Sequence, residues 1–179
     1  SSTSQAESAV DESETVVEEP TEKRISFIGV GDNLIHDNII WAAETPDGSY
    51  DFSHMYDNIA TDVENADLAF LNQETIFAGP DYAYAGYPSF NTPEQLGQNM
   101  VDLGFDLVNG ATNHTLDYGA SGAEYALNVW NQYDQVLYTG VFASEEASHE
   151  IPTIERDGVT FSFLAYTYGT NGIEPDTNW

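Results

Sequence analysis

Polar residues that can do chemistry follow three apolar segments of the chain, at the points where buried strands are expected to end. The run Asn-His-Thr-Leu-Asp-Tyr-Gly at 113–119 follows one of these segments. Asp32 follows another, and Asn72 with Glu74 follows the third. Because ligands in open α/β sheets bind beyond the carboxyl ends of the strands, we expect these side chains to meet at one edge of a sheet.

The residue types at this edge suit a divalent metal ion. Asp32, Asn72, Glu74 and Asn113 offer carboxylate and amide oxygens, and His114 offers one imidazole. Such a donor set suits Mg, Mn, Fe or Zn better than a thiophilic metal. The alternative is that these Asp and Asn side chains only satisfy backbone groups at turns.

His114 and Asp117 are candidates for acid–base catalysis. The His114 imidazole is a candidate general acid toward a leaving oxygen, and Asp117, three residues later, is a candidate to orient it or to stabilise its charge. His36, four residues after Asp32, is a candidate to face the same pocket.

A loop rich in Tyr, Pro and Gly over residues 79–91 supplies aromatic side chains that can line a binding cleft. Tyr84 and Tyr87 are its candidates for substrate contact. The alternative is that the aromatic side chains of this loop cover a hydrophobic core.

The charge balance excludes one class of partner. The chain of 179 residues has 31 acidic residues and 3 Lys or Arg, which gives a formal net charge of −28 at pH 7. Such a surface repels nucleic acids and anionic membranes at contact range, so we do not expect nucleic-acid binding. It attracts divalent cations, and an anionic polymer would need bridging cations or a local positive centre to bind.

Residues 1–23 are predicted to form a disordered acidic linker, because they are rich in Ser, Thr, Glu and Val and have no apolar period. A tail of this kind often tethers an exported domain to a membrane lipid or a cell wall; the alternative is a flexible terminus. The chain has no cysteine, which excludes disulfides, zinc–thiolate sites and thiol nucleophiles. No segment approaches the roughly 20 apolar residues of a membrane span.

Residues 24–179 are predicted to form one α/β domain. Alternating strands and helices indicate a mostly parallel sheet, and Asp157-Gly158 between two apolar runs predicts an antiparallel hairpin at the end. Ser53 is the expected N-cap of one helix, and Gly104 the expected residue after the end of another. The expected strands before the hairpin are 24–30, 66–71, 105–109 and 136–139, and the last helix spans about 122–133.

Four motifs, within about residues 25–172, resemble the CapA-type poly-gamma-glutamate capsule biosynthesis family of bacteria in order and spacing. They lie at 27–34, 70–75, 89–93 and 104–122, and the run at 113–119 is the most specific. That family is similar to calcineurin-like metallophosphatases, whose fold is a two-sheet sandwich flanked by helices. The resemblance implies the same type of fold for this chain.

The resemblance also implies roles for the candidate residues. Asp32 would be a metal ligand from the first strand, Asn72 or Glu74 would occupy the bridging-ligand region, and Asn113 would ligate metal. His114 would be the acid that meets the leaving group. The implied reaction is metal-assisted hydrolysis of a phosphate ester or a related bond, with two ions in the full-length domain.

Two departures from the pattern matter. Metallophosphatases normally carry Asp-x-His in the first motif, whereas Asp32 is followed by Asn33 and Leu34. The family domain is longer and carries further strands and histidines, so we expect this chain to be incomplete at its C-terminus. The sheet left exposed is an association hazard, and a homodimer would cover it.

The leading interpretation is therefore an extracellular, surface-anchored bacterial protein that acts on a surface polymer or a phosphate ester, and that meets the membrane only through an N-terminal tether. One alternative is a non-catalytic surface scaffold with the same fold. Another is a module that binds carbohydrate or peptide through the loop 82–90.

Overall fold

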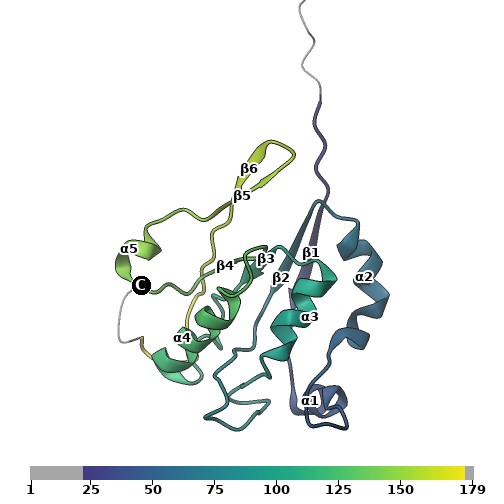
Figure 1. Ribbon diagram of the computed structural model, residues 1–179. Coiled ribbons are helices and arrows are strands. Elements are labelled where there is room, and N and C mark those ends of the chain that lie inside the picture. The colour runs from purple at the N-terminus through teal and green to yellow at the C-terminus, as the bar shows by residue number, and fades with distance from the viewer. Residues whose placement is uncertain (1–21, 176–179) are drawn as a thin grey trace, which may run out of the picture.

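Four parallel strands form the main sheet of the protein, which the computed structural model describes over residues 22–175 (Figure 1). Residues 1–21 of the predicted linker lie outside the described residues. A separate antiparallel hairpin follows the main sheet, so the predicted mostly parallel sheet and the predicted hairpin are both confirmed. The strands are, in spatial order, β1 (Phe27–Asp32), β2 (Leu68–Asn72), β3 (Leu107–Asn109) and β4 (Leu137–Thr139), and the hairpin strands are β5 (Thr153–Arg156) and β6 (Val159–Ser162).

The helices that connect the main strands share one hydrophobic core. Because parallel connections are right-handed and the strand order is sequential, each connection returns over the same face of the sheet. Apolar side chains of the connecting helices pack there against Ala69, Leu71 and Val108. Over residues 22–175, every helix is too short or too polar to span a bilayer. The helices are α1 (Asp37–Ala43), the 3-10 turn η1 (Ser53–Tyr56), α2 (Asp57–Glu64), α3 (Gln95–Leu103), α4 (Gly119–Trp130) and α5 (Glu145–Ser148).

Within residues 22–175, no helix covers the opposite face of the sheet. Phe27 on β1 is 61% exposed there, while Phe70 on β2 packs edge-on against Phe163, with ring centroids 5.7 Å apart. Phe163 directly follows the hairpin, from which the chain returns along the sheet (Figure 1). The segment after the hairpin therefore partly covers the helix-free face.

The turn residues predicted from the sequence, Gly104, Asp157 and Gly158, all have the left-handed backbone conformation that such turns require. Gly104 ends α3 in the left-handed region with φ of 100°, and its N–H bonds the Met100 and Val101 carbonyls. Asp157 and Gly158 at the tip of the hairpin also have positive φ values, 49° and 72°. Two consecutive left-handed residues suit a two-residue hairpin turn.

The prediction that Ser53 caps a helix is wrong. Its backbone N–H and its hydroxyl both donate to Asp51 Oδ1, at 2.9 and 2.6 Å, so Ser53 is a donor and Asp51 is the acceptor. The expected single helix here is a 3-10 turn followed by α2. The predicted last helix also begins earlier, at Gly119, because the turn 113–118 leads straight into it.

Arg156 fastens the hairpin to the amino-terminal edge of the main sheet. Its guanidinium donates to the Asp106 carboxylate and to the Asp67 carbonyl, and Asp106 also accepts the Ala69 N–H. Both acidic partners directly precede strands of the sheet. The hairpin is thus held by a charge-assisted contact, which is stronger than a neutral hydrogen bond.

Replacing Arg156 by Met is expected to lower the free energy of unfolding by about 1–2 kcal/mol, because it leaves the half-buried Asp106 carboxylate without its cation. Arg24→Met is the matched control, since Arg24 pairs with Glu22 at an exposed position and its loss should cost less than about 0.5 kcal/mol. Urea titrations of both variants measure this. Equal losses of unfolding free energy would contradict the role of Arg156 in anchoring the hairpin.

Candidate active site

The carboxyl ends of β1, β2 and β3 bring three polar residues into one row. Asp32 lies opposite Asn72, and Asn72 lies opposite Asn109. The register shifts between Val30 and Asp32, so Gly31 is an extra residue in β1. Because side chains alternate between the faces of a strand, this bulge turns Asp32 to the helix-free face, on which Asn72 also lies.

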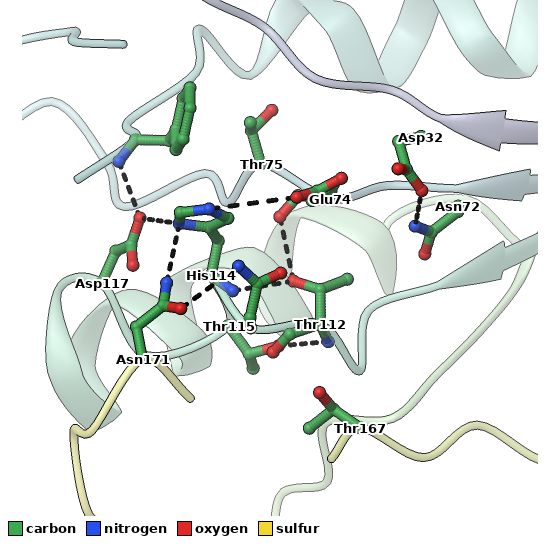
Figure 2. A network of polar contacts seen from close by, with 12 residues as sticks. Asp32, Asn72, Glu74, Thr75, Thr112, His114, Thr115, Asp117, Thr167 and Asn171 are labelled. Atoms are coloured by element: carbon green, nitrogen blue, oxygen red, sulfur yellow. Dashed lines mark hydrogen bonds and ion pairs between the residues drawn. The ribbon is translucent and has the colours of Figure 1, made fainter. Parts of the chain in front are cut away.

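Amide hydrogen bonds connect this row. Asn72 Nδ2 donates to Asp32 Oδ1 at 2.6 Å (Figure 2). Asn109 Nδ2 donates to Asn72 Oδ1 at 2.6 Å, and Asn109 Oδ1 accepts the Ala111 N–H at 3.1 Å. The bonds fix the rotamers of three side chains at the ends of three neighbouring strands.

Glu74 follows β2 and lies near Asp32. Burial and the neighbouring Asp32 carboxylate raise the pKa of the Glu74 carboxyl, while His114 and His36 lower it. The Glu74 side chain is 15% exposed. Two carboxyl groups this close repel each other unless a proton or a cation lies between them.

His114 and Asp117 form a buried pair, with Asp117 Oδ2 2.8 Å from His114 Nδ1. The same oxygen accepts the Phe90 N–H at 2.8 Å, which fixes the carboxylate. With Nδ1 held by Asp117, Nε2 is directed toward Glu74, whose Oε1 is 3.9 Å away (Figure 2). The pair is oriented for proton transfer at Nε2.

The structure brings the four predicted metal ligands together around one cavity of about 600 Å³. His114 does not line this cavity, but its Nε2 lies 3.9 Å from Oε1 of Glu74, which does. One wall is formed by the C-terminal segment 167–172. The other residues that line the cavity are Asp32, Asn72, Glu74, Asn109, Ala111, Thr112 and Asn113.

His36 and His114 both contact the ring of Phe90. The Phe90 ring contacts both imidazoles edge-on, with centroids 5.2 Å from His36 and 4.6 Å from His114. His36 is close enough to Glu74 to affect its pKa. Tyr84 packs edge-on against Tyr50, which is partly buried against the core, and Tyr87 is 74% exposed. Neither tyrosine lines this cavity, so their substrate contact stays a prediction.

A buried polar network ties the loop after β1 to the loop after β2. Asn33 Nδ2 donates to Gln73 Oε1 at 2.9 Å, and Asn33 Oδ1 accepts from the Tyr56 hydroxyl at 2.5 Å. Burial raises the pKa of Tyr56 to about 12, so its hydroxyl stays a donor. Gln73 Nε2 donates to the Thr75 carbonyl at 2.7 Å. These bonds hold Asp32 and Glu74 at fixed positions from within the core.

No basic side chain neutralises the carboxylates of this edge, since all three Lys and Arg of the chain are used elsewhere. Lys23 donates to the Asp157 carbonyl, Arg24 pairs with Glu22, and Arg156 anchors the hairpin. Within residues 22–175, no three His, Cys, Asp or Glu side chains form a metal-binding cluster. The donors here are instead two carboxylates and several amides, which fit a hard divalent cation.

The comparison with protein families finds a match over residues 26–179 to the family described as Bacterial capsule synthesis protein PGA_cap. The chain belongs to this family. Membership confirms the resemblance drawn from the four sequence motifs.

A curated relative is the PGA biosynthesis protein CapA of Bacillus subtilis (strain 168), which is 23% identical over 123 residues. The matched part is 60% of this chain and 32% of that protein. The PGA_cap chain thus matches about a third of the length of this relative.

Two residues of the candidate site were missed from the sequence. Asn109 ends β3 as Asn72 ends β2, so the strand-end pattern carried a signal for it. Asn171 is 57 residues from His114 in sequence, yet its Nδ2 lies 3.3 Å from His114 Nδ1. No local pattern indicates such a contact.

Glu74→Gln is expected to raise the melting temperature at pH 7 in EDTA. The raised pKa means that the ionised Glu74 carboxylate destabilises the folded state, and glutamine removes this cost. The gain should be full above the folded-state pKa and should vanish below the ordinary value of 4.5, where wild-type Glu74 is protonated in both states. Thermal melts across pH measure it, and a gain that persists at pH 3 would contradict the assignment.

Proposed function

We propose that this PGA_cap chain acts in the synthesis of a bacterial surface polymer, outside the cell membrane, as a metal-dependent hydrolase of a phosphate ester or related bond. The observation that supports this proposal is the juxtaposition of two pairs. The buried His114–Asp117 pair is directed at Glu74, and Glu74 lies beside Asp32 with no Lys or Arg side chain of residues 22–175 paired with either carboxylate.

Asp32, Glu74 and Asn113 would hold one divalent cation at this edge, and Asn72, whose NH₂ group faces Asp32, would hold that ligand in place. The support is chemical, because adjacent carboxylates at a wet cavity are stabilised by a divalent charge, and amide oxygens are ligands that Mg²⁺ and Mn²⁺ accept. A cation held there would supply a Lewis acid for a phosphoryl oxygen.

The protein's own groups supply orientation and a proton. Asp117 keeps the His114 ring in one orientation through its hydrogen bond with Nδ1. His114 Nε2–H is then the donor to a leaving oxygen in the cavity. The backbone N–H of Phe90 holds the Asp117 carboxylate, and the Phe90 ring shields one side of the imidazole from water.

The negative charge of the chain affects which substrates it can bind. We propose poly-gamma-glutamate metabolism from the name of the curated relative, and polyglutamate is an anion. A net charge of −28 opposes its binding. The cation site is then the point at which an anionic group of the polymer or of its precursor is drawn to the surface.

Titration calorimetry with Mn²⁺ tests the metal site. We expect one ion per chain, and Asp32→Asn should weaken binding at least about tenfold because a charged donor is lost. Asp134→Asn is the control: Asp134 is exposed and lies in the turn before β4, at the opposite edge of the sheet. Absence of Mn²⁺ binding to the wild-type chain would refute the metal site and favour the scaffold interpretation.

Hydrolysis of bis(p-nitrophenyl) phosphate in Mn²⁺ tests the acid. His114→Gln and Asp117→Asn should each lower kcat by about 10²–10⁴, because proton donation is lost or misdirected. Their Mn²⁺ affinity should stay close to that of wild type. His54→Gln, at an exposed histidine, should leave kcat unchanged. Full activity of His114→Gln would remove His114 from the mechanism.

A further inference from the structure

The C-terminal strap, residues 167–172, closes one side of the cavity over the sheet edge. It follows the segment that packs on the helix-free face through Phe163. The turn of the strap is held by its own bonds: Thr167 Oγ1 donates to the Gly169 carbonyl at 3.0 Å, and Thr170 Oγ1 bonds the Ile173 carbonyl. The shape of the strap therefore does not require the side chain of Asn171.

Asn171 instead directs its side chain at the site. Its Oδ1 accepts from Asn113 Nδ2 at 3.2 Å. Its Nδ2 lies 3.3 Å from His114 Nδ1 (Figure 2). Its backbone has φ of 54°, in the left-handed region that favours glycine. The site contacts are thus made by an asparagine at a position where glycine would be less strained.

The orientation of the Asn113 amide decides what Asn113 can bind. Only the oxygen of an amide can ligate a cation, whereas its NH₂ group repels one. A half-turn of the side chain exchanges the two, so a hydrogen-bond partner must select one orientation. Asn171 Oδ1 accepts the Asn113 NH₂, and no donor among the described residues bonds Asn113 Oδ1.

We propose that Asn171 is a positioning residue that fixes the Asn113 amide with its oxygen free for a divalent cation, and so makes the strap part of the metal site. This inference rests on the proposed cation site. Groups that hold a metal ligand in position typically change metal affinity by roughly 10–100-fold when they are removed. Asn171 is placed to act in this way through the acceptor Oδ1 alone.

Two substitutions separate the side chain from the backbone. Asn171→Gly removes the acceptor and relieves the left-handed conformation, so the melting temperature in EDTA should not fall. Asn171→Asp keeps an oxygen at the Oδ1 position and therefore keeps the hydrogen bond from Asn113. Tyr168→Ala is the control, because Tyr168 lines the cavity and is fully exposed.

The experiment is Mn²⁺ titration calorimetry on the full 179-residue chain. We expect Asn171→Gly to weaken Mn²⁺ binding roughly 10–100-fold, and Asn171→Asp and Tyr168→Ala to bind at least about as tightly as wild type. Unchanged affinity in Asn171→Gly, or equal losses in the Gly and Asp variants, would overturn the inference. If wild type itself binds no Mn²⁺, the proposed function fails instead, which is a distinct result.

The side-chain NH₂ signals of Asn113 in metal-free protein give a second readout. Two-dimensional ¹⁵N NMR should show them shifted in Asn171→Gly and close to their wild-type positions in Asn171→Asp, because the hydrogen bond to residue 171 is lost in the first and kept in the second. Signals unchanged in Asn171→Gly would show that Asn171 does not hold this amide.

Discussion

The sequential parallel order of the four main strands is the constraint on which the site depends. Because the strands are parallel, each delivers its following polar residues to the same edge, and right-handed connections place the connecting helices on one face. The other face is left for the chain that returns from the hairpin. Arg156 anchors this returning segment at the amino-terminal edge, and Asn171 meets the site at the carboxyl edge.

Electrostatics gives this edge its chemical character. The chain has 31 acidic residues but only 3 Lys or Arg, so few acidic side chains can have a cationic partner. Arg156, which is partly buried, pairs with Asp106 and holds the hairpin. Asp32 and Glu74 are left beside each other, and burial together with the Asp32 carboxylate raises the pKa of the Glu74 carboxyl. A site that is unfavourable for two bare carboxylates is favourable for a proton or a divalent ion.

Much of the fold was predictable because its signals are local. Apolar runs marked the four strands, Gly104 marked the end of a helix, and Asp157-Gly158 marked the hairpin turn. The error at Ser53 arose because a hydroxyl can donate as well as accept. The carboxylate of Asp51 two residues earlier is the stronger acceptor, and it takes both Ser53 donors.

The sequence by itself determined which residue types follow each strand, and the parallel pattern was enough to predict that Asp32, Asn72, Glu74 and Asn113 meet. Only the tertiary structure decided which way they face and what holds them. The bulge that turns Asp32, the packing of Phe90 against His36 and His114, and the contacts of Asn171 all join segments distant in sequence. Such contacts arise from register and packing between elements, which no local periodicity encodes.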